Sequence, residues 1–187
     1  MIATRLIGGV VMLLAVLSAC TTSPSKEAPA TSAQQPTPAG GTPSTRAMPG
    51  NKSKDDALQA YLGMWQDVAT AALTSDWQSP HLADHAMGDA LSVISKAMYA
   101  DHYKGLITKG APKNYPSVSS VEPVNAPTTV MISDCGDSTN WLKYKAATGE
   151  LADNSPGGRR SITAEVRRQA DGSWKVTRFA VEGLGTC

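Results

Sequence analysis

The sequence predicts an α+β domain over residues 55–187, in which N-terminal helices pack on a curved antiparallel sheet. Two observations support this fold class. Before Gly105 the apolar residues recur at steps of three and four, which is the spacing of amphipathic helices, and after Gly105 they alternate with polar residues, which is the spacing of strands. Helices followed by a run of strands are typical of an α+β fold rather than of a parallel α/β sheet.

The first helix is expected to begin at about Asp55. Ser53 and Asp56 have the S-x-x-D spacing of a helix start, and the two aspartates suit the positive end of the helix dipole. The apolar side chains then form one stripe along the helix. The stripe consists of Leu58, Tyr61, Leu62, Trp65, Val68, Ala69 and Ala72.

Two more helices are expected before the strands begin. Ser79-Pro80 combines a cap with a proline at the first helical position, and it opens a short helix through about Ala86. Asp89 can cap a third helix, and Gly105 lies where a glycine commonly follows a helix end. The apolar side chains of this third helix are Leu91, Val93, Ile94, Ala97 and Met98.

Six strands are expected after the helices. Their ranges are Leu106–Lys109, Ser117–Val124, Thr128–Cys135, Asn140–Ala146, Arg160–Gln169 and Ser173–Glu182. In the last strand Trp174 and Val176 share one parity, while Phe179 and Val181 share the other. Either a β-bulge near Thr177 or a strand that is covered on both faces explains this change of parity.

The N-terminus predicts export. Met1–Arg5 is a positively charged start, and the apolar run Leu6–Val16 has the length of a signal-peptide core, about 7–15 residues. This run is shorter than the ~20 residues of a membrane-spanning helix. Leu17-Ser18-Ala19-Cys20 resembles a bacterial lipobox. The resemblance implies cleavage before Cys20 and lipidation of its thiol, with an uncleaved anchor or an ordinary secretory signal as the alternatives.

Residues 20–54 are expected to form a disordered tether behind the signal peptide of residues 1–19. The segment is rich in Pro, Thr, Ser and Ala, and residues 21–54 contain no Val, Ile, Leu or aromatic residue. Such a composition cannot bury enough apolar surface to offset the loss of chain entropy. The chain is therefore expected to hold one globular domain, residues 55–187.

The order of elements resembles the nuclear-transport-factor-2-like fold, a cone in which a bent sheet wraps the first long helix. The resemblance is to the form found in small secreted lipoproteins of actinobacteria, and it covers nearly the whole domain. The residues that carry it are Tyr61 to Trp65, Gly88-Asp89-Ala90-Leu91, Lys104-Gly105-Leu106, Asp134-Cys135, Trp141-Leu142-Lys143-Tyr144, Pro156-Gly157-Gly158-Arg159-Arg160 and Trp174 through Cys187.

Ketosteroid isomerases and polyketide cyclases of this superfamily place an acid–base residue inside the cone near a tyrosine of the first helix, and Tyr61 lies at a plausible height. No Asp or His of this chain matches that catalytic motif residue by residue, so no catalytic residue is assigned. Four aromatic side chains could line a pocket with their polar tips, or could instead pack in the core. They are Tyr61, Trp65, Trp141 and Tyr144.

The cysteines predict one disulfide. Assigning Cys20 to lipid leaves Cys135 and Cys187, and two thiols in an exported domain have one intramolecular pairing. A bridge would fasten the C-terminus to the sheet and stabilise the fold by about 4 kcal/mol on the chain-entropy model. The alternative, a redox-active or metal-binding thiol pair, lacks a C-x-x-C spacing.

Two further polar groups have alternative interpretations. His81 and His85 lie at i and i+4, which suits either a metal pair or exposed helix polarity. They lack the HExxH glutamate and an evident third ligand, so no metal and no cofactor are expected. Gly157-Gly158-Arg159-Arg160 could hold a phosphate or carboxylate, or could form a polar hairpin turn.

The functional expectation is a lipid-anchored protein on the outer face of the cell membrane, with a non-enzymatic binding or scaffolding domain. The alternatives are a cone-pocket enzyme of isomerase, cyclase or dehydratase type, and an accessory or sensor subunit of a cell-envelope complex. The expected partners are the membrane, through the anchor, and a cell-envelope protein or a small hydrophobic ligand. The net charge of +1 disfavours nucleic-acid binding, which usually needs a clustered positive excess.

Cys20→Ala should abolish incorporation of labelled palmitate and release the protein from the membrane fraction. The reason is that stable anchoring needs acyl chains, and the leader alone is too short to span. Labelling and cell fractionation measure both effects. A variant that keeps its label and stays in the membrane fraction would contradict the lipoprotein prediction.

Overall fold

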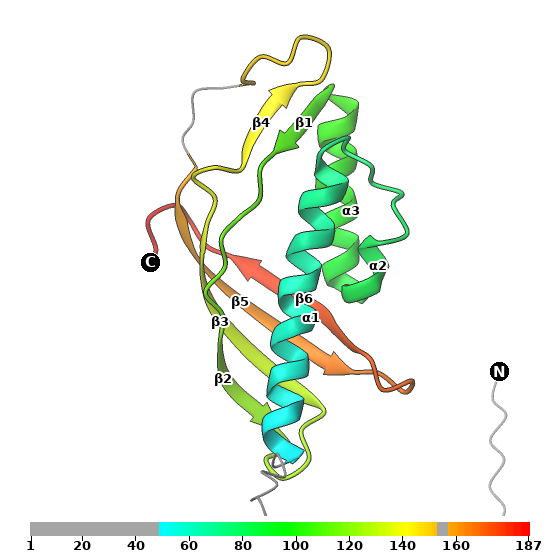
Figure 1. Ribbon diagram of the computed structural model, residues 1–187, viewed down its shortest axis with the longest axis vertical. Helices are drawn as coiled ribbons and strands as arrows, with labels where there is room; N and C mark the ends of the chain where they lie inside the picture. Colours follow the sequence, from blue (N-terminus) through cyan, green and yellow to red (C-terminus); the bar gives the residue numbers. More distant parts are fainter. Residues whose placement is uncertain (1–48, 153–156) are drawn as a thin grey trace, which may run out of the picture. The chain divides into compact units, whose positions relative to one another are not determined.

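The structure is a computed structural model that describes residues 49–152 and 157–187. These residues form three helices followed by six strands (Figure 1). Cys20, the predicted signal peptide and the tether up to residue 48 lie outside the described residues, and what was expected of them stays a prediction. No helix within the described ranges combines the length and hydropathy of a bilayer-spanning segment.

The helices are α1 (Pro49–Ala72), α2 (Leu82–His85) and α3 (Gly88–Tyr103). All three correspond to predicted helices, although α1 begins earlier than predicted. Gly105 follows the end of α3 with a positive φ of 65°. Glycine adopts this left-handed conformation without a steric penalty, so the predicted helix end is confirmed.

The first helix begins at Pro49, a few residues before the helix start predicted from the spacing of Ser53 and Asp56. Proline suits the first turn because it has no backbone N–H to leave unpaired. Lys52 Nζ lies 2.7 Å from Asp56 Oδ1 one turn later, a pairing that favours the helix slightly. Ser53 consequently lies inside α1 rather than at its N-cap. The segment just before Asp55 has no large aliphatic or aromatic residue, and this composition is compatible with an exposed helical turn as well as with a tether.

The buried face of α1 is wider than the predicted apolar stripe. Tyr61 and Met64 are almost fully buried, whereas Leu62 is 36% exposed. Most of the additional buried residues are alanines. Their small side chains fit where a helix lies close to a sheet, but they are too weakly apolar to mark a buried face in the sequence. The buried residues outside the predicted stripe are Ala57, Ala60, Met64 and Ala71.

The six predicted strands are all present, with ends that shift by a few residues. They are β1 (Leu106–Lys109), β2 (Ser117–Glu122), β3 (Thr129–Asp137), β4 (Leu142–Lys145), β5 (Arg159–Arg168) and β6 (Trp174–Val181). They form two antiparallel sheets rather than one. The larger has the order β2-β3-β5-β6, and β1 pairs with β4 in a separate two-stranded sheet. β4 therefore leaves the run of strands between β3 and β5.

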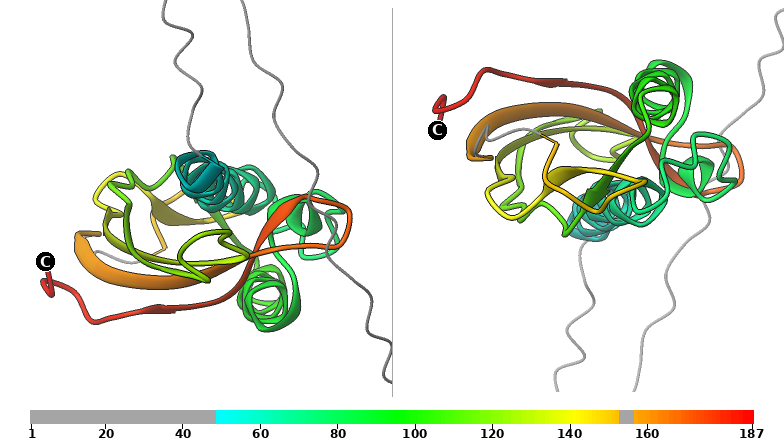
Figure 2. Two further views of the ribbon diagram at one scale, coloured as in Figure 1. Left: turned by 90° about the horizontal axis from the view of Figure 1, so that it is seen from below. Right: turned by 90° about the horizontal axis from the view of Figure 1, so that it is seen from above.

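The larger sheet curves around α1, and α3 lies beside β6 (Figures 1 and 2). The core fills the space between α1 and the inward-facing, even-numbered positions of β3 and β5. Those positions are Val130, Ile132, Ile162, Ala164 and Val166. The predicted fold class, helices packed on a curved antiparallel sheet, is confirmed.

β6 contains a β-bulge at Thr177, one of the two alternatives that the sequence left open. The consecutive β5 residues Glu165 and Val166 pair with Arg178 and Val176 of β6, so Thr177 is the extra residue. Because side chains alternate along a strand, one extra residue moves the inward-facing positions of β6 from even to odd numbers.

A buried glutamate holds the bulge in place. Thr177 Oγ1 donates a hydrogen bond of 2.6 Å to Glu165 Oε1, and Arg178 Nη2 donates one of 2.6 Å to Oε2. Arg167 Nε lies 2.9 Å from Oε1. Burial alone would raise the pKa of Glu165, but the hydrogen bond from Thr177 and the charges of Arg167 and Arg178 outweigh it and lower that pKa below its ordinary value.

Glu165→Gln should reduce the loss of stability in acid. A folded-state pKa below the unfolded value of about 4.3 means that the carboxylate stabilises the fold above that pH and loses this contribution as pH falls through the folded value. Urea unfolding at pH 7 and pH 3 should therefore show a larger wild-type advantage at pH 7. Glu150→Gln, at an exposed position, is the matched control. An advantage that is equal at both pH values would contradict the linkage.

Candidate ligand cavity

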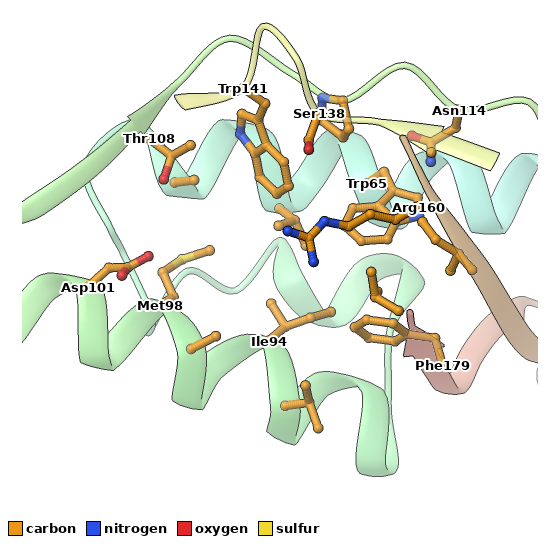
Figure 3. A pocket seen from close by; sticks show the side chains of 18 of the residues that line it. Trp65, Ile94, Met98, Asp101, Thr108, Asn114, Ser138, Trp141, Arg160 and Phe179 are labelled. Carbon is orange, nitrogen blue, oxygen red and sulfur yellow. The ribbon is translucent and has the colours of Figure 1, made fainter. Parts of the chain in front are cut away.

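A cavity of about 380 Å³ lies between α1, α3 and the inner face of the sheet (Figure 3). The two helices both pack on β1 and β6, and the cavity occupies space between them. Ligand cavities in proteins usually measure about 300–1,000 Å³, so this one has the size for a small ligand.

The helices supply an apolar wall. In each helix the lining residues lie three or four positions apart and so share one face. They are Trp65, Val68 and Ala72 from α1, and Val93, Ile94, Ala97 and Met98 from α3. The sequence predicted all seven as members of the apolar stripes and Trp65 also as pocket lining, but it did not predict that the two stripes face each other across a cavity.

The strands β5 and β6 close the opposite side. Phe179 and Val181, which follow the bulge, line the cavity together with Ile162 of β5. Trp174 and Val176, which precede the bulge, belong to the buried core. The bulge therefore divides β6 into a half that fills the core and a half that lines the cavity.

The rim is built from loops whose backbones approach too closely for side chains. Gly157 passes the carbonyl oxygen of Ser138 at a distance that leaves no room for a Cβ, and Gly110, with a φ of 87°, approaches Asn140 in the same way. These contacts fix the loop that carries Trp141. A larger residue at either glycine would displace this loop from the cavity.

Two of the four aromatic side chains predicted to line a pocket do so. Trp65 and Trp141 line the cavity, and their rings meet edge to face with centroids 6.1 Å apart. Tyr61 and Tyr144 are not part of this lining. Tyr61 is fully buried in the core, and Tyr144 lies on β4 with Lys109 Nζ 4.7 Å from the centre of its ring.

Tyr61 instead belongs to a buried hydrogen-bond network around Asp134. Tyr61 Oη donates to Asp134 Oδ2 at 2.8 Å, Asn114 Nδ2 donates to the same oxygen at 2.6 Å, and the Tyr115 N–H donates to Oδ1 at 2.6 Å. Burial, and then the hydrogen bond to Asp134, raise the pKa of Tyr61 well above its ordinary value. Both carboxylate oxygens already accept hydrogen bonds, so the network ties α1 to β3 rather than presenting an acid–base group to the cavity.

Three charged side chains also line the cavity: Asp101, Lys143 and Arg160. Lys143 Nζ lies 2.6 Å from Asp101 Oδ1. The sequence predicted Arg160 both as the first residue of a strand and as part of a turn with Gly157. β5 begins at Arg159, so Arg160 is a strand residue. Sequence reasoning missed Asp101 and Lys143, because no local pattern joins residues so far apart in the chain.

The structure supports the predicted disulfide. The sulfur atoms of Cys135 and Cys187 lie 2.13 Å apart. The tail before Cys187 continues the pairing with β5, because the Glu182 N–H donates to the Ser161 oxygen at 2.9 Å and the Gly185 N–H donates to the Arg159 oxygen at 2.8 Å. The C-terminal tail is thus fastened along the first half of β5.

The histidines of α2 and the turn before it contact separate carboxylates. His81 Nδ1 lies 2.9 Å from Asp84 Oδ2, and His85 Nδ1 lies 2.7 Å from Asp67 Oδ2. The two rings therefore do not converge on one point. Within the described part of the chain, no group of three or more His, Cys, Asp or Glu residues is arranged to hold a metal ion.

One solved structure shares the fold of this chain, and two others are less similar to it. The intermembrane space region of chloroplast protein ARC6 matches with a TM-score of 0.50 at 15% identity, covering 68% of this chain and 95% of that one. A ketosteroid isomerase-like protein from Erwinia carotovora atroseptica matches with a TM-score of 0.38 at 14% identity, covering 70% and 95%. A cystatin-like protein of unknown function from Nostoc punctiforme matches with a TM-score of 0.39 at 10% identity, covering 69% and 92%.

No protein-family model and no curated protein matches the chain. At these low identities the structural likeness concerns the fold alone. The predicted actinobacterial lipoprotein origin stays a prediction.

Tyr61→Phe should lower the free energy of unfolding by about 1.5–3 kcal/mol, because Asp134 loses a buried donor. The raised pKa of Tyr61 adds a pH dependence: its contribution is complete below the unfolded pKa of about 10 and is lost as pH rises above it. Urea unfolding at pH 8 and pH 11 should show a smaller alkaline loss for the variant. Tyr103→Phe, at a residue that is 82% exposed, is the control. Equal stability of the Tyr61 variant and wild type would contradict the role of the network.

Proposed function

We propose that this protein is a lipid-anchored, extracytoplasmic binding domain that holds a small, largely apolar ligand in the cavity between α1 and α3. The observation that carries the proposal is the cavity itself. It has the size of a ligand site, and two helices and two strands line it with mostly apolar side chains. The signal-peptide and lipobox pattern around Cys20 supports the anchored, exported location.

Binding without catalysis is favoured by the positions of the carboxylates. Asp134 is buried with its oxygens occupied by Tyr61, Asn114 and the backbone of Tyr115. Asp101 does line the cavity, but Lys143 pairs with it. An isomerase, cyclase or dehydratase needs a positioned acid or base within reach of its substrate. We therefore prefer a binding role to these enzymatic alternatives.

Binding of the neutral fluorophore N-phenyl-1-naphthylamine tests the proposal. Ala97→Phe places a ring at the cavity wall and should weaken binding by about tenfold or more, because the probe loses apolar contact area. Ser92→Phe is the matched control, since Ser92 is exposed on the same helix and does not line the cavity. Every chain in the assay carries Cys20→Ala, which keeps an acyl group from competing.

Fluorescence titration should give saturable binding to the parent chain, which carries Cys20→Ala alone, and to the Ser92→Phe chain. Equal binding by the Ala97→Phe and Ser92→Phe chains, or no saturable binding by the parent, would rule out the cavity as the site.

A further inference from the structure

Arg160 is a cationic side chain on the inward face of β5. It shares the parity of Ile162, Ala164 and Val166, which are buried, whereas Arg159 before it faces outward and is exposed. Figure 3 shows the guanidinium group of Arg160 pointing into the cavity. Its register partner on β3 is Gly136, whose lack of a side chain leaves room for the ends of the Ile162 and Asn114 side chains. The strand therefore delivers a positive charge into a mostly apolar cavity.

This guanidinium has little compensation from the protein. Its one hydrogen bond among the described residues is long, 3.4 Å from Nη1 to the backbone oxygen of Glu182. The acidic residue on the cavity wall, Asp101, is already paired with Lys143 at 2.6 Å. Arginine stays protonated at any physiological pH, and a partly buried charge is unfavourable unless an opposite charge or hydrogen-bond acceptors meet it.

The polar groups of the lining are unevenly placed. Apart from Asp101 the helices contribute apolar side chains such as Val68 and Met98, whereas polar side chains from the loops, among them Asn114 and Ser138, lie on the side of Arg160. A ligand that matches this distribution has an apolar chain and a polar head.

We propose that the cavity binds a single-chain amphiphile with an anionic head group, and that Arg160 receives the head group. Carboxylate and phosphate both offer the paired acceptor oxygens that a guanidinium fork binds in a bidentate manner. The apolar chain lies against α1 and α3. This inference rests on the proposed function of the same cavity and adds the chemical class of the ligand and the residue that selects it.

Displacement of N-phenyl-1-naphthylamine separates the head group from the chain. Dodecanoate, dodecyl phosphate and dodecanol share one alkyl chain. At pH 8 the two anions are used below their critical micelle concentrations and dodecanol below its solubility limit. The two anions should displace the probe from the parent chain at concentrations about 10- to 100-fold lower than dodecanol, the range expected for hydrogen bonds to a charged group. Comparing the two anions identifies which head group is preferred.

Arg160→Gln should remove this preference and leave displacement by dodecanol unchanged. Arg159→Gln is the matched control, because it removes the same charge from the adjacent, outward-facing position and should leave all three ligands unaffected. Arg160→Lys keeps the charge without the fork and should retain part of the preference. Displacement by dodecanol also shows whether each variant keeps a folded cavity.

The outcomes distinguish the two proposals. Saturable probe binding without any preference for the anions overturns the role of Arg160 but leaves the cavity as an apolar site. An anion preference that falls equally in the Arg159 and Arg160 variants also overturns it, because it points to general electrostatic attraction. Absence of probe binding to the parent chain removes the proposed function itself.

Discussion

The bulge at Thr177 decides which side chains of β6 face the helices. Before it, Trp174 and Val176 fill the core, and after it, Phe179 and Val181 line the cavity. An unbroken strand would turn the second pair toward the opposite face. Glu165 stabilises the irregularity because it accepts hydrogen bonds from Thr177 and Arg178 while these groups offset its burial. A buried polar group on the outer side of the sheet thus permits an apolar cavity on its inner side.

Two other arrangements keep that cavity from closing. The hydrogen bond from Tyr61 to Asp134 ties α1 to β3, and the close backbone contacts of Gly110 and Gly157 hold the rim loops. Both are rigid connections around an unfilled space, whose lining forgoes the contacts that a packed core would make. α1 and α3 both pack on β1 and β6. These strands therefore hold the facing apolar surfaces of the two helices apart.

The sequence predicted the elements better than their contacts. Alternation and helical spacing are local signals, and they located the three helices, the six strands, the end at Gly105 and the change of parity in β6. Pairing is not local, so the separation of β1 and β4 into their own sheet was missed. The start of α1 was missed because a helix stabilised by packing extends into a polar segment that has no apolar pattern. Tyr61 and Tyr144 were grouped with the tryptophans as aromatic residues, although the first bonds to Asp134 and the second lies on β4.

Arg160 shows where such a prediction stops. The sequence predicted Arg160 as the first residue of a strand, and its parity with Ile162 indicates an inward-facing position, but the same residue also belonged to the predicted glycine turn. The pairing of Arg160 with Gly136 is seen only in the structure, where the ends of the Ile162 and Asn114 side chains lie beside this glycine. An arginine opposite a glycine, on a strand whose other inward residues are apolar, is costly for stability unless an anion meets it. The charge of Arg160, which the protein itself offsets only weakly, therefore gives the cavity its selectivity for an anionic head group.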